Sequence, residues 1–377
     1  MSQTKVEAPF VANNANFRNL FINGDMSIAQ RATSATGLTG SSYPTIDRMS
    51  MQAASAGTWT QSQSTDVPTG EGFATSLKMD CTTANGSLSS GSYLIIDQRF
   101  EGQMLQHLKK GTSNSQKVTL SFFVKSAKTG TYIVNIRDDD NTRNISKSYT
   151  ISSADTWEKK VITFDADTSG ALDNDNAQSF AVLFFLAAGS DRSSGTLATS
   201  WESTTNANRA VGQVNLADST DNDWYLTGVQ LEVGDTASDF EHLPFDVNLQ
   251  RCIRYCRLLK MQGIHSGSYQ FANNWSRINP TYANTASEMR TVPSAAWKTA
   301  TPTFDASATA LTTDTNEFRW GYNGTEVDTT PSATLGIDNI GFYSLSIYNS
   351  GINHNTNGST GFVSFKVQPT IILNAEL

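Results

Sequence analysis

Three short acidic runs hold the side chains best suited to binding a cation. They are Arg-Asp-Asp-Asp-Asn at 137–141, Asp-Asn-Asp-Asn at 173–176 and Asp-Ser-Thr-Asp-Asn-Asp at 218–223. Calcium takes carboxylate and carbonyl oxygens as ligands, but no run has the glycine and distal glutamate of a complete EF-hand loop. We therefore expect solvated turns capped by Asp and Asn and no cofactor, with calcium kept as an alternative. The candidate ligands for that alternative are Asp138, Asp140, Asp173 and Asp175.

Tryptophan side chains could stack on the flat face of a sugar, and the chain has seven of them. Trp157 and Trp224 flank expected strands, which favours packing. Five others lie among polar residues and are better candidates: Trp59, Trp201, Trp275, Trp297 and Trp320. Nearby Arg and Tyr side chains could bind hydroxyl groups, so the candidate glycan-binding residues are Trp275, Arg277, Trp320 and Tyr322. For each tryptophan, packing under a loop or at a subunit interface is the alternative.

The residue types of common catalytic sites do not gather in this sequence. The four histidines are scattered: His107, His242, His265 and His354. There is no nucleophile elbow, metal-binding motif or helical pair of histidines. A carboxylate pair for glycoside hydrolysis needs only two residues brought together in space, so that alternative stays open. We expect a protein that is not an enzyme.

Composition and charge exclude other classes. The net charge of −8 argues against nucleic acid, whose phosphates require a basic surface. No run of about 18 apolar residues is present, so we expect no membrane insertion. Charged residues make up 16% of the chain, against roughly 25% in ordinary globular proteins. Ser, Thr, Asn and Gly take their place and favour turns and exposed strand faces, so we expect an all-β protein.

Alternation of apolar and polar residues predicts half-buried strands in the first two thirds of the chain. The runs 118–124 and 132–136 alternate in this way, and 180–188 is apolar on both faces, as in a covered central strand. In the run 225–233, alternation assigns four apolar residues to the inner face: Tyr225, Val229, Leu231 and Val233. Clusters of Gly, Asn, Asp and Ser separate these runs. We predict a jelly-roll β-sandwich over 17–243.

One segment changes to helical spacing. Over 244–262, apolar residues recur as on one face of a helix: Leu249, Cys252, Ile253, Cys256 and Leu259. This stripe predicts an amphipathic helix, with Asp246 near its start. Strand patterning then returns. We predict that the helix connects the sandwich to a smaller C-terminal β-sandwich domain over 263–377.

Three segments carry a resemblance to known families. Asn19–Arg31, with its Asn-Gly-Asp, resembles the opening strand of jelly-roll carbohydrate-binding modules, and Asp155–Asp167 resembles their middle strand. Asp223–Arg257 is similar to the closing strand and following helix of bacteriophage tail and appendage proteins. Within it, Gly-Val-Gln-Leu-Glu-Val-Gly at 228–234 and Phe-Glu-His at 240–242 carry the similarity. In the carbohydrate-binding modules the closing strand commonly bears an Asp pair that helps hold calcium, whereas Thr227 and Gly228 stand here, which argues against a calcium site of that type.

The resemblance implies a structural protein of a phage virion, often homotrimeric, on the external surface of the particle. The leading hypothesis is a tail fibre or tip that contacts host surface glycans during host recognition. A capsid decoration protein or head fibre is one alternative. A polysaccharide-degrading enzyme, or its sugar-binding module, is another.

The first 16 residues are polar and irregular, and they predict an arm rather than part of the sandwich. Apolar residues within and beside it could dock on a partner, since they would otherwise be exposed to solvent: Val6, Phe10, Val11 and Phe17. We expect this arm at 1–16 to anchor the protein to other virion proteins.

Overall fold

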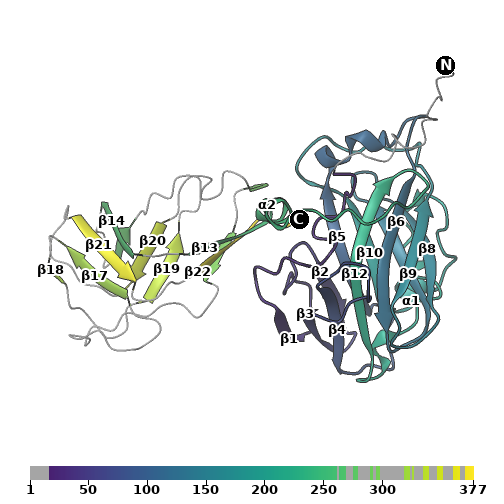
Figure 1. The fold of residues 1–377 in the computed structure, drawn as a ribbon, viewed down its shortest axis with the longest axis horizontal. Coiled ribbons are helices and arrows are strands. Elements are labelled where there is room, and N and C mark those ends of the chain that lie inside the picture. Colours follow the sequence, from purple (N-terminus) through teal and green to yellow (C-terminus); the bar gives the residue numbers. More distant parts are fainter. Residues whose placement is uncertain are drawn as a thin grey trace, which may run out of the picture. The chain divides into compact units, whose positions relative to one another are not determined.

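The computed structural model describes residues 17–260 continuously and, after them, 263–268, 275–278, 289–291, 294–297, 318–322, 325–326, 334–338, 346–350, 360–365 and 370–377. Side chains are described for 17–258, 289–291, 294 and 371–377. The chain divides into two compact units, Met1–Cys252 with Leu377, and Ile253–Glu376. Figure 1 shows that both are built of strands.

The predicted arm at 1–16, with Val6, Phe10 and Val11, lies outside the described residues. Phe17, at its border, is exposed, and its backbone N–H donates to the Glu241 Oε1 atom at 2.6 Å.

The first unit is a β-sandwich of two antiparallel six-stranded sheets (Figure 1). Sheet A has the order β1 (Ser34–Leu38), β3 (Thr58–Ser64), β4 (Ser76–Thr83), β12 (Asp223–Val233), β6 (Val118–Ser126) and β9 (Glu158–Phe164). Sheet B has the order β11 (Glu202–Ser203), β8 (Arg143–Ile151), β7 (Gly130–Asp138), β10 (Gln178–Ala188), β5 (Tyr93–Glu101) and β2 (Ser50–Ala54). The all-β jelly-roll class predicted from sequence is confirmed.

The core lies between the two sheets, where the alternation of each strand places its apolar residues. On β6, Val118, Leu120, Phe122 and Val124 all belong to this core, as the sequence predicts. Large aromatic side chains fill its centre, among them Phe122, Phe184 and Trp224, whose rings contact one another edge to face or tilted. Burial of so many large side chains is the main stabilising contribution to this unit.

Strand β10 is apolar on both faces because both are covered, as its sequence predicts. Its inward residues join the main core. Its outward residues Ala181, Leu183 and Phe185 form a second cluster with Ile95, Ile133 and Ala210. Leu197 also packs against that cluster, so the segment that follows β10 covers this part of sheet B.

Strand β12 corrects two details of the sequence interpretation. Tyr225, assigned to the inner face, lies outside the core cluster, while Trp224, Leu226, Val229 and Leu231 lie within it. Val233, also assigned to the inner face, is the last residue of the strand and is 38% exposed. The pairing of β12 with β6 shifts register between Thr227 and Gln230. This β-bulge adds a residue and reverses the alternation, so Tyr225 faces outward although Val229 faces inward.

The predicted helix over 244–262 is correct only in its first half. Helix α2 spans Phe245–Ile253, and Cys256–Lys260 form strand β13, which pairs with β22 (Thr370–Asn374). The apolar positions of β13 also fit helical spacing. However, β22, an apolar strand from the far end of the chain, pairs with β13 and provides partners for its backbone hydrogen bonds. Tertiary pairing therefore overrides local preference.

The second unit is also β, as predicted for 263–377. One described sheet joins β13, β22 and β16 (Ser294–Trp297). A second joins β14 (Gly263–Ser268), β21 (Thr360–Phe365), β17 (Phe318–Tyr322) and β18 (Thr325–Glu326). A third joins β15 (Trp275–Ile278), β20 (Ser346–Ser350) and β19 (Thr334–Asp338).

The remaining helices are single turns in the loops of the sandwich. They are η1 (Gly102–Met104), η2 (Gln106–Leu108), α1 (Ser190–Ser193), η3 (Asn206–Asn208) and η4 (Leu216–Asp218). Within the described part of the chain, no helix is long and apolar enough to span a membrane.

Candidate functional site

The glycan-binding residues chosen from sequence fall in the second unit. Trp275 and Arg277 belong to β15, and Trp320 and Tyr322 belong to β17. Their side chains lie outside those that the structure describes, so these four assignments stay predictions.

Two other tryptophans are placed differently from the sequence interpretation. Trp59, taken as a surface candidate, is fully buried, and its Nε1 donates to the Ala56 carbonyl at 2.7 Å. Its polar neighbours in sequence are outward residues of β3, and these conceal an inward position. Trp201 is half-buried, packs against the core and donates to the Asp165 carbonyl at 2.7 Å. The Trp59 indole is therefore not available to a ligand, and the Trp201 Nε1 already has an acceptor within the protein.

The acidic runs form hydrogen-bonded turns. Asp140 Oδ2 accepts from the backbone N–H of Asp173 at 2.9 Å, and Asp175 Oδ1 accepts from Ala177 N–H at 2.9 Å. Asp138 accepts from Lys110 and from Asn141. Among the described residues, no three His, Cys, Asp or Glu side chains are grouped to hold a metal ion.

The outer face of sheet A carries a row of aromatic and charged side chains that crosses three strands. Tyr225 on β12 pairs with Lys78 of β4 on one side and with Lys125 of β6 on the other. The Lys125 ammonium lies 4.2 Å from the Tyr225 ring centroid and the Lys78 ammonium lies 5.5 Å from it. Both cations therefore flank the phenol ring.

Trp157, just before β9, extends this row. Its ring meets Tyr225 edge to face, with centroids 6.0 Å apart, and its Nε1 donates to Asp66 Oδ1 at 2.9 Å. The other Asp66 oxygen accepts from Lys125. Trp157 is half-buried and so keeps part of its ring in solvent. We define the Tyr225 patch as Asp66, Lys78, Asp80, Lys125, Trp157, Asp223 and Tyr225.

Charges within the Tyr225 patch are paired. Lys78 Nζ lies 2.9 Å from Asp80 and 3.7 Å from Asp223. Burial, and then the nearby Asp223 carboxylate, raise the pKa of Tyr225 to about 12, so its hydroxyl stays protonated and can donate. Burial alone would raise the pKa of Asp66, but hydrogen bonds from Lys125 and Trp157 outweigh this and lower it. Tyr225 is 7% exposed and Lys125 is 9% exposed, so the surface of the patch is formed by the half-buried Trp157 with Lys78, Asp66 and Asp80 beside it.

A phenylalanine cluster adjoins the patch on the same face. Phe73 contacts Phe123 and Phe240 with ring centroids 5.6 and 5.0 Å away. His242, which is exposed, contacts Phe240 at 4.9 Å. Gly228, at φ +61°, makes room for these rings, since a Cβ there would lie 2.6 Å from the Phe73 Cζ atom.

By the sequence resemblance, Thr227 and Gly228 stand at the positions where the carbohydrate-binding modules commonly carry an Asp pair. Thr227 Oγ1 donates to the Thr75 carbonyl at 2.8 Å, and Gly228 accommodates the phenylalanine cluster. Both positions have packing roles here.

Sequence reasoning missed both aromatic residues of the Tyr225 patch. Trp157 was assigned to packing because it precedes a strand, and Tyr225 was assigned to the core because the bulge was not foreseen. Gly228 is the signal that could have shown the bulge, since an isolated glycine within a strand pattern often marks one.

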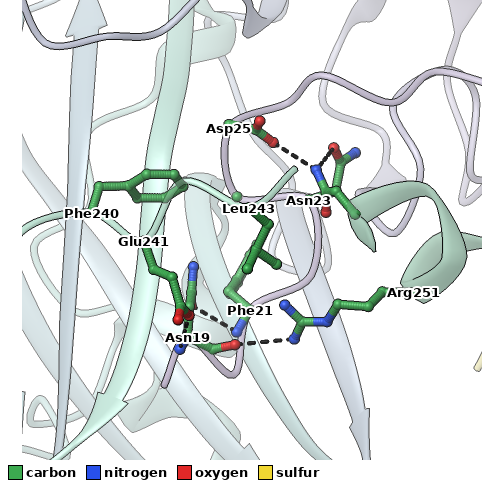
Figure 2. A pocket seen from close by; sticks show the side chains of 10 residues that line it. Asn19, Phe21, Asn23, Asp25, Phe240, Glu241, Leu243 and Arg251 are labelled. Atoms are coloured by element: carbon green, nitrogen blue, oxygen red, sulfur yellow. Dashed lines mark hydrogen bonds between the residues drawn. The ribbon is translucent and has the colours of Figure 1, made fainter. Parts of the chain in front are cut away.

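Two of the three segments that carry the family resemblance, Asn19–Arg31 and Asp223–Arg257, meet at one place in the sandwich, shown in Figure 2. Asn19 lies at its centre. Its Nδ2 donates to the Val229 carbonyl at 3.0 Å, while its Oδ1 accepts from the N–H groups of Phe21 at 2.9 Å and Leu231 at 3.0 Å. One buried side chain thus ties the segment at 19–21 to the closing strand.

Glu241 and Arg251 complete this junction (Figure 2). Glu241 Oε2 accepts from the Asn19 N–H at 2.9 Å, and Arg251 Nη2 donates to the Asn19 carbonyl at 3.0 Å. The Glu241 N–H donates to Gln230 Oε1 at 2.8 Å. We call Asn19, Gln230, Glu241 and Arg251 the Asn19 clamp.

The pocket beside the Asn19 clamp is small. Asn248 on α2 borders it and donates to Asp25 Oδ1 at 3.0 Å. The cavity volume is about 10 Å³, roughly the space of one water molecule. The residues that resemble the known families therefore hold the fold together, and this pocket has no room for a sugar.

Comparisons with known proteins give structural similarity only. No protein-family model and no curated protein matches the chain. A domain of the bacteriophage CBA120 tailspike protein 4 is 14% identical over 58% of this chain and 22% of its own, with a TM-score of 0.30. A putative sugar-binding protein from Bacteroides thetaiotaomicron is 13% identical over 57% of this chain and 99% of its own, at 0.31.

A family 11 carbohydrate-binding module from Clostridium thermocellum, in complex with a mixed-linked tetrasaccharide, is also similar. It is 13% identical over 57% of this chain and 95% of its own, with a TM-score of 0.25. TM-scores this low do not support an inference about function. In addition, the chain spans only about a fifth of the length of the tailspike domain. The fold assignment rests on the strand order described above.

Proposed function

We propose that the sandwich binds glycan through the Tyr225 patch and that the protein has no catalytic role. The observation that carries the proposal is the row of Lys78, Tyr225, Lys125 and Trp157 across the outer face of sheet A. Aromatic surface suits the apolar face of a sugar ring. Paired carboxylates and ammonium groups beside it suit hydroxyl groups, which both donate and accept hydrogen bonds.

The charges of the Tyr225 patch favour a neutral polysaccharide. The three carboxylates of Asp66, Asp80 and Asp223 face the two ammonium groups of Lys78 and Lys125, so one negative charge is left over. A strongly charged polymer would gain little electrostatic binding energy at this patch. A flat site of this kind binds a single chain weakly, and several copies on one particle raise the avidity.

We place this activity on the external surface of a phage particle, in a tail fibre or tip that contacts host glycans. The resemblance of Asp223–Arg257 to phage appendage proteins supports this location. A homotrimer attached through residues 1–16 would present three patches together. A capsid decoration protein or head fibre is the alternative, and antibody or gold labelling of particles distinguishes the two by where the label lies.

Binding is tested with the full chain on a glycan array and on host lipopolysaccharide. We expect weak binding that Trp157→Ala reduces by about tenfold, equivalent to roughly 1.4 kcal/mol. Phe245→Ala is the matched control, because this phenylalanine is 65% exposed and lies on α2, away from the patch.

Phe245→Ala should keep the wild-type melting temperature. Trp157→Ala loses the hydrogen bond to Asp66 and the contact with Tyr225, so binding is measured at a temperature at which circular dichroism shows both variants to be folded. The proposal is wrong if the wild-type protein binds no glycan, or if Trp157→Ala binds as well as Phe245→Ala. Hydrolysis of a bound polysaccharide would instead favour the alternative of a polysaccharide-degrading enzyme.

A further inference from the structure

Lys110 is a buried lysine at one end of the sandwich, between η2 and β6. Its side chain is 4% exposed, and so is that of Asp167, while that of Asp138 is fully buried. Long charged side chains are rarely buried unless they are fully paired. The surroundings of the ammonium group therefore decide what this lysine does.

Four oxygen atoms and one aromatic ring surround the Lys110 ammonium. It donates to Asp138 Oδ2 and lies 2.9 Å from Asp167 Oδ2. It also donates to the carbonyl oxygens of Ser169 at 2.9 Å and Gly170 at 3.0 Å. The ring of Trp201 lies 5.1 Å away, within the range of a cation–π interaction.

The two carboxylates are themselves held in place. Asp138 Oδ1 accepts from the Asn141 backbone N–H at 3.0 Å and from its Nδ2 at 3.2 Å. Arg143 donates from Nε and Nη2 to the two oxygens of Asp167, at 2.7 and 3.0 Å. Two carboxylates thus face one ammonium and one guanidinium, and the buried charges balance.

Two carboxylates and two backbone carbonyls form the kind of oxygen set that binds calcium. The distances differ, however. Calcium–oxygen bonds are about 2.3–2.6 Å, whereas three of the ammonium contacts here are 2.9–3.0 Å, the usual length for an N–H donor. Three of the four oxygen atoms therefore lie at hydrogen-bond distance from the ammonium nitrogen and too far from it for calcium–oxygen bonds.

We propose that Lys110 acts as a built-in cation, whose ammonium occupies an oxygen cage and fixes three loops without a bound metal. The loops are the one that carries Lys110, the β7–β8 turn with Asp138 and Asn141, and the β9–β10 connection with Asp167, Ser169 and Gly170. Asp138, a candidate calcium ligand from sequence, then serves this ammonium.

An open cleft of about 390 Å³ lies beside the cage, and Lys110 is itself one of its lining residues. Leu105, Lys109 and Leu172 are among its lining residues. Gly111, next to Lys110, donates its N–H to the Asp167 carbonyl at 3.0 Å. A Cβ on Gly111 would lie 2.5 Å from the Ala171 nitrogen, so the two walls lie in close contact at that point.

The test uses full-length Lys110→Ala and Lys110→Met. Both lose the ammonium, and we expect the melting temperature to fall by about 10 °C. Lys110→Ala leaves a space shaped like n-propylammonium, so n-propylammonium chloride should restore part of the loss. Lys110→Met fills the space, so the same salt should restore nothing. Sodium chloride and 1-propanol serve as controls for ionic strength and apolar binding.

An unchanged melting temperature in Lys110→Ala would overturn the proposal. So would equal effects of n-propylammonium on Lys110→Ala, Lys110→Met and the wild-type protein. Restoration of Lys110→Ala by calcium chloride at lower concentration than by n-propylammonium chloride would also overturn it, since the cage would then prefer a metal.

A second measurement needs no variant and so does not depend on whether Lys110→Ala folds. Reductive methylation of the native wild-type protein, followed by peptide mass spectrometry, compares Lys110 with its neighbour Lys109, which is exposed. We expect Lys109 to be methylated and Lys110 to be protected by at least tenfold in rate. Equal rates would show that the ammonium leaves the cage readily, and the proposal would be wrong.

Discussion

Gly228 shows how one residue decides on which face of a sheet its neighbours lie. The β-bulge around it turns Tyr225 outward and Val229 inward, and its missing side chain admits the ring of Phe73. A positive φ and the close approach of the Phe73 ring coincide at Gly228. Two separate requirements therefore disfavour any larger residue at this position.

Gly228→Ala should therefore lower the free energy of unfolding by about 2–4 kcal/mol, from backbone strain and from the clash with Phe73. Gly212→Ala is the matched control. Gly212 has φ +88° with nothing within 4 Å of the position of a Cβ. Gly212→Ala should therefore lose unfolding free energy through backbone strain alone. Urea unfolding followed by tryptophan fluorescence measures both. Equal losses in the two variants would show that Phe73 does not depend on the glycine.

Asn19 is the second residue whose role depends on its exact chemistry. It pairs three buried backbone groups at once, on Phe21, Val229 and Leu231. An ionised Asp has no donor, and a Ser hydroxyl carries its donor and acceptor on a single atom of a shorter side chain, so neither can replace the separate amide groups of Asn19.

Asn19→Ala should cost about 3 kcal/mol of unfolding free energy, because three buried backbone groups lose their partner. Asn174→Ala, at an exposed position of the β9–β10 connection, is the control and should cost less than about 0.5 kcal/mol. Similar midpoints for the two variants in urea would mean that water replaces the Asn19 side chain without loss.

At the scale of elements, sequence predicted what alternation alone determines. The strands β6, β7 and β10 were placed correctly, and the all-β class followed from them. The second half of the predicted helix was wrong, because β13 depends on a partner strand more than a hundred residues away. The outward position of Tyr225 was missed because a bulge interrupts the alternation that the prediction assumes. The four residues proposed from sequence for glycan binding, Trp275, Arg277, Trp320 and Tyr322, stay predictions, because their side chains lie outside those that the structure describes.

At the scale of the molecule, several carboxylates of the sandwich are held in their charged form. Burial would raise the pKa of Asp167, but Arg143 and Lys110 outweigh it and lower the pKa below the usual 3.8. Asp66 and Asp218 are lowered in the same way by hydrogen bonds from Lys125 and Lys128 respectively. These three sites lie on different loops, so their effects should add.

Stability of the sandwich should therefore fall in acid. Each of these carboxylates has a lower pKa when folded, so the unfolded chain binds more protons as the pH falls. Their contribution to the free energy of unfolding is complete above about pH 5. It is lost as the pH decreases through the depressed pKa values of the folded state. Urea unfolding between pH 7 and pH 3 should show this decline, with a shallower slope for Asp167→Asn. A flat profile, or an unchanged slope in Asp167→Asn, would contradict it.

The separation of the Asn19 clamp from the Tyr225 patch has a consequence for how this protein can diversify. The clamp residues Asn19, Gln230, Glu241 and Arg251 are distinct from every residue of the patch, so selection can act on one set without the other. A library randomised at Trp157, Lys78 and Asp80 should consequently yield many folded members with new ligand preferences. Retargeting such a scaffold would then require changes at the patch alone, with the clamp left constant.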